Sequence, residues 1–255
     1  MCRLLGIYGR VDNWREIVTA FSKQAETGII PPEEGTAPGH KDGWGMTISN
    51  GKRSAMLSLI RQLGSAHDSE GYREALYSLP TQPDIFLCHL RKASDTIPIT
   101  LANTHPFVQN GWAFIHNGTV FGAQSLPRDS SLAFTSDASD TEHLFHYLLT
   151  KITERPQNAK ISDSIVDALS SMGLDYTALN FLLSNAGELY VVRYFQKYET
   201  YYSLYYYQLA DGIIICSEPI DSKGLNRAGW KLLANKCLLR IHGNPPRIEE
   251  TGIWQ

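Results

Sequence analysis

Hydrophobic residues along the chain are concentrated in short dense runs that predict β-strands. The runs at 4–8, 84–91, 178–184, 188–195, 212–217 and 237–242 are almost wholly apolar, as expected of buried strands. The tyrosine-rich segment 200–210 also predicts a strand, half-exposed, that could form a contact between two copies of the chain. Apolar residues at helical spacing predict helices over 14–26, 69–79, 140–152 and 162–172.

Local turn and cap signals divide these elements. Asn50-Gly51 lies between segments 44–49 and 52–60 and predicts a hairpin, and Asn117-Gly118 favours a second one within 111–120. Ser139 and Glu142 have the spacing of a capping box for the helix that begins at residue 140. Because strands and helices come in blocks, the pattern favours an α+β fold of antiparallel sheets, with residues 1–255 as a single domain.

Composition excludes several classes of function. The formal net charge is −3 and basic residues form no stripe, so no nucleic-acid partner is expected. No apolar run is long enough to span a bilayer, and the short run after Arg3 is too short for a signal peptide. We therefore expect a cytoplasmic protein with no membrane partner, whose ligand is a small molecule or another protein.

The position of Cys2 raises a chemical question. Of the four cysteines, Cys88 and Cys216 lie in apolar strand runs and read as small core residues, whereas Cys2 directly follows the first methionine. It could be an ordinary core residue too. If Met1 is removed, however, one residue carries both a thiol and a free α-amine. That amine, with a pKa of about 8, could accept the thiol proton near neutral pH.

Four other short stretches could carry chemistry, although each also has a structural explanation. They contain Arg91 at a strand end, His105 before a proline, Asn117-Gly118, and Asp140 at a helix start. Cleavage of an amide by a thiol needs a base, oxyanion donors and groups that hold the substrate. For glutamine, an arginine suits the α-carboxylate, an aspartate suits the α-ammonium, and an Asn-Gly pair suits the oxyanion.

A metal or cofactor is not expected. His143 and His146 have a spacing that could serve a metal ion, but no second cluster with ligand spacing supports such a site.

Taken together, these stretches make the chain resemble the class II glutamine amidotransferases, which are N-terminal-nucleophile hydrolases, and their stand-alone YafJ-like members most of all. The similarity runs in order through MCRLLG, GHKDGWGM, CHLRKAS, LANTHPF, FIHNG, TSDASDTEHLF, LNFLLSNAGELY and ICSEP. The resemblance implies a four-layer αββα sandwich, two antiparallel sheets face to face with helices outside.

The resemblance also implies residue roles. Cys2 would be the nucleophile with its own amine as base, Asn117 and Gly118 the oxyanion hole, Arg91 the carboxylate clamp and Asp140 the ammonium partner. A second set would support the substrate pocket: His105, Ser94, Trp44 and Gly45. One departure concerns the pocket rim, since Lys92, Ala93 and Ser94 stand where the large synthases have an aromatic residue and then threonine.

The expected activity is therefore hydrolysis of the glutamine side-chain amide through a thioester on Cys2, with ammonia released or passed to a partner enzyme. One alternative keeps this chemistry but takes a small γ-glutamyl conjugate as substrate. The other is a non-catalytic subunit that senses glutamine or docks to an enzyme.

Overall fold

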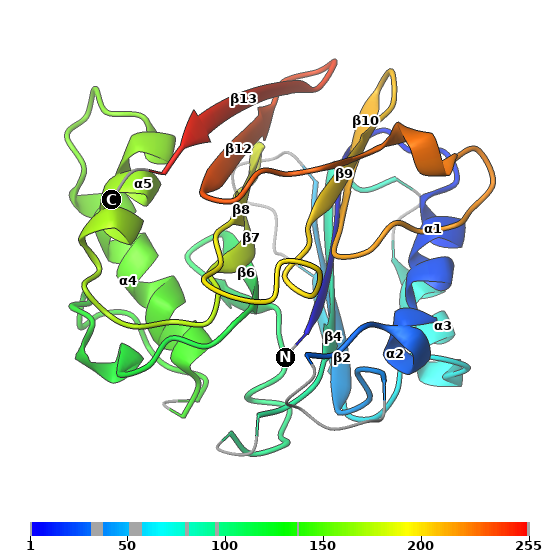
Figure 1. Ribbon diagram of the computed structural model, residues 1–255, viewed down its shortest axis with the longest axis horizontal. Coiled ribbons are helices and arrows are strands. Elements are labelled where there is room, and N and C mark those ends of the chain that lie inside the picture. The colour runs from blue at the N-terminus through cyan, green and yellow to red at the C-terminus, as the bar shows by residue number, and fades with distance from the viewer. Residues whose placement is uncertain are drawn as a thin grey trace.

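The structure, a computed structural model, describes residues 2–31, 38–50, 58–79, 82–94, 97–136 and 138–253. Two antiparallel sheets face one another at its centre (Figure 1). The first contains, in spatial order, β11 (Trp230–Leu232), β9 (Tyr205–Gln208), β10 (Gly212–Cys216), β1 (Arg3–Gly9), β4 (Ile85–Arg91), β2 (Gly43–Ser49) and β3 (Ser58–Gln62). The second contains β13 (Arg247–Gly252), β12 (Cys237–His242), β8 (Glu188–Arg193), β7 (Asn180–Ser184), β6 (Trp112–Asn117) and β5 (Phe107–Gln109).

Helices cover both outer faces of this pair of sheets (Figure 1). On the first sheet lie α1 (Trp14–Phe21), α2 (Gln24–Thr27) and α3 (Glu70–Ser78), and on the second lie α4 (Asp140–Glu154) and α5 (Ile161–Ser171). Short 3₁₀ turns, η2 (Ala123–Ser125) and η3 (Arg227–Gly229), occur in connections. The expected four-layer αββα sandwich is therefore confirmed.

Alternation along the strands builds the core between the sheets. In β1, Leu4 and Tyr8 point toward the second sheet, whereas Leu5 and Ile7 point toward the helices. Gly6 also faces the second sheet, and a Cβ there would lie 2.8 Å from Leu182 Cδ1. The absence of a side chain at residue 6 thus lets the sheets approach closely at the middle of β1.

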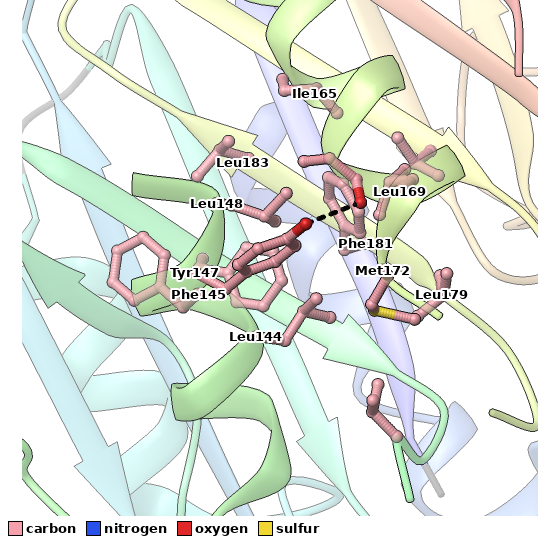
Figure 2. Packing of buried hydrophobic residues seen from close by; sticks show 14 of the residues in the cluster. Leu144, Phe145, Tyr147, Leu148, Ile165, Leu169, Met172, Leu179, Phe181 and Leu183 are labelled. Atoms are coloured by element: carbon pink, nitrogen blue, oxygen red, sulfur yellow. Dashed lines mark hydrogen bonds between the residues drawn. The ribbon is translucent and has the colours of Figure 1, made fainter. Parts of the chain in front are cut away.

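A second apolar layer fixes α4 and α5 on the other sheet. Figure 2 shows Leu144 and Leu148 of α4 packed with Leu169 of α5 and with Phe181 of β7. Tyr147 keeps its polar end satisfied by donating to the carbonyl of Ala168 at 3.0 Å. This packing holds the first turn of α4, and with it Asp140, against the end of the second sheet.

Most predicted elements are confirmed, with differences in detail. The helix predicted over 14–26 is divided into α1 and α2 at Ser22-Lys23. The predicted pairing of the segments 44–49 and 52–60 is confirmed as β2 with β3, but Asn50-Gly51 is not a two-residue turn between them, because Ile48 pairs with Ser58; residues 51–57 lie outside the described residues. The predicted strand over 200–210 is confined to β9, since Tyr201 and Tyr202 are buried in the turn before it.

Two local predictions are wrong. Asn117-Gly118 is not a hairpin turn: the hairpin joins β5 to β6 through Asn110 and Gly111, whose φ angles of +49° and +77° suit a tight two-residue turn. Glu142 does not close a capping box, because its carboxylate accepts from the backbone N–H groups of Thr135 and Ser136 at 2.6 and 2.7 Å.

The sequence also gave no prediction of β11 and β13, which lie at sheet edges and carry polar residues. Across the described ranges, no helix is both long and apolar enough to cross a membrane.

Candidate active site

Three residues that the sequence predicted for the site lie together at one end of the interface between the two sheets. Cys2 precedes β1, Arg91 ends β4 and Asn117 ends β6. Strand alternation gives each of them the inward-facing position, because Leu4, Leu87 and Ile115, two or four residues away on the same strands, lie in the core between the sheets. They adjoin a cavity of about 40 Å³ whose wall includes Cys2 and Arg91.

Cys2 and Asn117 are in direct contact. The backbone N–H of Cys2 donates to Asn117 Oδ1 at 2.8 Å, and both side chains are almost fully buried. The thiol lies 3.8 Å from the carbonyl oxygen of Lys92. Asn117 Nδ2 is buried and has no hydrogen-bond partner in the part of the chain that the structure describes. The side-chain oxygen of Asn117 therefore holds Cys2 in place, and its side-chain nitrogen remains available as a donor.

Gly118 follows Asn117 where the second sheet gives way to the cavity wall. A Cβ at this position would lie 1.9 Å from the carbonyl oxygen of Ala178, far inside contact distance. Only glycine therefore fits here, and its main chain borders the cavity without a side chain to obstruct it.

Arg91 points into the same end of the sandwich and is 4% exposed. Its Nη2 donates to the carbonyl of Pro98 at 3.0 Å, while Nη1 is buried without a partner among the described residues. Burial lowers the pKa of Arg91, opposed by the nearby Cys2 and Asp42, and an arginine stays charged under such a shift. The guanidinium therefore presents a positive charge beside the thiol and exchangeable hydrogen bonds for a carboxylate.

Asp140 forms the opposite wall as the first residue of α4. One carboxylate oxygen, Oδ2, accepts from the N–H of Val120 at 2.8 Å, which ties the helix start to the segment after Gly118. Asn103 lines the cavity as well: its Nδ2 donates to Pro98 O at 3.0 Å, and its Oδ1 is buried with no partner in the described ranges. Asp140 and Asn103 thus supply acceptors near the cavity.

Three buried histidines support the cavity from behind: the rings of His89 and His105 lie 4.1 Å apart, and the N–H of His116 donates to His105 Nδ1 at 3.4 Å. Burial lowers the pKa of all three, that of His89 and His105 to well below the ordinary value, and Asp140 opposes the shift at His116. His116 is neutral with its proton on Nε2, because Nε2 must donate to Ala178 O at 3.1 Å while Nδ1 accepts from the Thr141 hydroxyl at 3.0 Å.

The remaining predicted pocket residues lie in different places. Ser94 and His105 line the cavity. Gly45 faces inward beneath His105, since a Cβ there would lie 2.2 Å from the His105 carbonyl oxygen. Trp44 points the other way, into the apolar layer under the helices, where its ring lies 5.0 Å from that of Tyr72. Gly45 therefore positions His105, and Trp44 packs in the core away from the cavity.

The other three cysteines differ from Cys2 in setting. Burial raises the pKa of Cys88, Cys216 and Cys237 to about 12 in each case, so these thiols stay protonated near neutral pH. Within the described ranges, no group of three or more His, Cys, Asp or Glu side chains could hold a metal ion.

The sequence prediction missed several residues of the site. His116, Asn103 and Thr141 occur inside the quoted motifs FIHNG, LANTHPF and SDTEH, next to residues that were predicted. Tyr201, whose hydroxyl donates to Asn117 Oδ1 at 3.3 Å, carries no such signal. Its contact with the site spans 84 residues of sequence.

Comparison with known proteins agrees with this geometry. Residues 1–203 match the family model described as "Glutamine amidotransferases class-II". The chain belongs to the class II glutamine amidotransferases. It is 30% identical to the Escherichia coli (strain K12) protein YafJ over 206 residues, which is 76% of this chain and 72% of that one.

Two solved structures share the fold of this amidotransferase. The glutamine phosphoribosylpyrophosphate amidotransferase of Bacillus subtilis, complexed with ADP and GMP, superposes with a TM-score of 0.64 at 19% identity over all of this chain and 50% of its own. A class II domain protein from Silicibacter pomeroyi superposes with a TM-score of 0.62 at 21% identity over the full length of both chains. The chain thus spans about half of the B. subtilis enzyme.

Proposed function

We propose that this amidotransferase hydrolyses the side-chain amide of a glutamyl substrate through a thioester on Cys2. The observation that carries the proposal is the contact of Cys2 with Asn117, whose Nδ2 is left as an unpartnered donor, at a cavity also bordered by Arg91 and Asp140. This arrangement supplies a nucleophile, an oxyanion donor and charges of both signs for the substrate.

The proposed reaction requires removal of Met1, which turns the nitrogen of Cys2 into an amine. That amine takes the proton of its own thiol as Sγ attacks the amide carbon, and Asn117 Nδ2 with the Gly118 N–H stabilise the oxyanion. The C–N bond then breaks, the leaving nitrogen takes the proton from the ammonium, and ammonia departs. Water adds to the thioester, giving its proton through the amine to the departing thiolate.

Substrate binding would use the groups that the cavity leaves unsatisfied. Arg91 would take the α-carboxylate, exchanging its bond to Pro98 O for a charge-assisted one, and Asp140 with Asn103 would take the α-ammonium.

Ammonia release separates this proposal from a binding-only role. The processed protein is incubated with glutamine and with L-γ-glutamyl-p-nitroanilide, and intact mass establishes that Met1 is absent. We expect ammonia from glutamine and p-nitroaniline from the anilide with the wild type and with Cys237→Ala, and neither product with Cys2→Ala. Adding hydroxylamine should yield γ-glutamyl hydroxamate from the thioester. A preference for the anilide would indicate a conjugate hydrolase, whereas absence of turnover with both substrates would leave a sensing or docking subunit.

A further inference from the structure

Two buried residues outside the cavity connect the nucleophile to the oxyanion residue. Arg3 directly follows Cys2, and Tyr201 lies in the turn between β8 and β9, drawn in yellow near the start of β1 in Figure 1. Arg3 is 0% exposed and Tyr201 is 1% exposed. Their charge and hydroxyl are therefore held inside the protein, where they must have partners to be tolerated.

The hydroxyl of Tyr201 bears on the orientation of Asn117. Asn117 Oδ1 accepts from the Cys2 nitrogen at 2.8 Å and from the Tyr201 hydroxyl at 3.3 Å. A carboxamide has an oxygen that only accepts and a nitrogen that only donates, so the Cys2 N–H, which can only donate, requires the oxygen on its side and leaves the Nδ2 donor on the other. The Cys2 nitrogen exchanges protons in the proposed reaction, whereas the Tyr201 hydroxyl can donate to the same oxygen at every step.

Arg3 contacts both donors to Asn117, namely Tyr201 and Cys2. Its guanidinium carbon lies 4.6 Å from the centroid of the Tyr201 ring, within range of a cation–π contact. Its Nη1 donates to the carbonyl oxygen of Cys2 at 3.1 Å, and its Nε pairs with Glu218 at 2.6 Å. The ring and the nucleophilic residue are therefore fixed by the same cation.

From these contacts we infer that Tyr201 is a positioning residue for catalysis, and that Arg3 holds its ring in place. The Tyr201 hydroxyl keeps the Asn117 amide turned so that Nδ2 faces the developing oxyanion. The inference rests on the proposed amide hydrolysis, and it assigns Tyr201 a role in the rate of the chemical step and none in substrate binding.

Tyr201→Phe tests the inference, with Tyr202→Phe as its matched control. Tyr202 is the adjacent buried tyrosine, and its hydroxyl donates to Thr177 Oγ1 at 2.9 Å instead of to Asn117. We expect Tyr201→Phe to lower kcat for glutamine about tenfold with KM unchanged, since one hydrogen bond is lost and the ring stays over Arg3. Tyr202→Phe should keep the wild-type kcat, and a melting temperature for each variant controls for folding.

A double-mutant cycle shows whether Tyr201 acts through Asn117. In the Asn117→Ala background Tyr201→Phe should change kcat by less than twofold, because the amide it orients is gone. The rate at which iodoacetamide alkylates Cys2 should be the same in wild type and Tyr201→Phe. A full tenfold loss in the Asn117→Ala background, equal losses in the two tyrosine variants, or slowed alkylation would overturn the inference. Failure of the wild type to release ammonia would instead count against the proposed function.

Discussion

Replacing Asn117 by alanine should separate its catalytic role from its structural one. The substitution removes Nδ2, the buried donor that the structure leaves unpartnered among the described residues, together with the acceptor for the Cys2 nitrogen. Loss of one oxyanion donor lowers kcat by about 10²- to 10³-fold, equivalent to about 2.7 to 4 kcal/mol. Because Arg91 and Asp140 would still hold the substrate ends, KM for glutamine should change by less than about threefold. Initial rates of ammonia release measure both constants.

Asn180 provides the matched control. Asn180 on β7 pairs with Asn117 on β6 and is equally buried. Unlike Asn117, it uses both ends of its side chain: Nδ2 donates to Tyr202 O and Oδ1 accepts from Tyr194 N, each at 2.9 Å. Asn180→Ala should therefore destabilise the fold by about 1 to 3 kcal/mol in urea unfolding, as buried polar partners are left unsatisfied. Its kcat per folded molecule should stay near wild type. An equal loss of kcat in both variants, or a rise confined to KM in Asn117→Ala, would refute the oxyanion assignment.

Three further predictions use the same assays. Arg91→Ala should raise KM for glutamine at least tenfold, whereas 4-aminobutanamide, which lacks the carboxylate, should be handled alike by both proteins. Gly118→Ala should lower stability and should lower kcat about 100-fold, because a Cβ 1.9 Å from Ala178 O forces the strand end to shift. The control is Gly111→Ala, which should keep the wild-type kcat because a Cβ there meets nothing within 4 Å. The free energy of unfolding should fall as the pH drops below about 6.5, by about 1.4 kcal/mol per pH unit for each buried histidine. The reason is that unfolding lets each imidazole take up a proton that burial excludes. Equal urea midpoints at pH 7.5 and 5.5 would contradict this.

Strands with apolar residues on both faces could be predicted from the sequence, whereas the polar edge strand β13 could not. β1, β4 and β10 lie side by side at the centre of the first sheet and are covered by helices and by the second sheet, so almost every position is apolar. β13 has a neighbour on one side only, and Arg247, Glu249 and Glu250 are exposed on it. Its sequence therefore has no periodic apolar signal that distinguishes it from a loop.

Local motifs predicted residues that the fold brings to one cavity, but for two of them they predicted the wrong contacts. Glu142 has capping-box spacing, yet its carboxylate accepts hydrogen bonds from the backbone N–H groups of Thr135 and Ser136, which need acceptors. Asn117-Gly118 looks like a turn because both residues suit one. In the fold Gly118 is required for a different reason, the close approach of Ala178 O. Such contacts come from distant segments and leave no trace in local spacing.

The arrangement of the site makes its chemistry depend on how the two sheets meet. Cys2 precedes β1 and Arg91 ends β4 in the first sheet, whereas Asn117 ends β6 in the second sheet and Gly118 follows it, so the distance from the thiol to the proposed oxyanion donors is an inter-sheet distance. Farther along β1 the sheets also approach closely at Gly6, where a Cβ would lie 2.8 Å from Leu182 Cδ1. A one-ångström change in such a distance can cost about 100-fold in rate. Substitutions that part the sheets should therefore reduce activity before they unfold the protein.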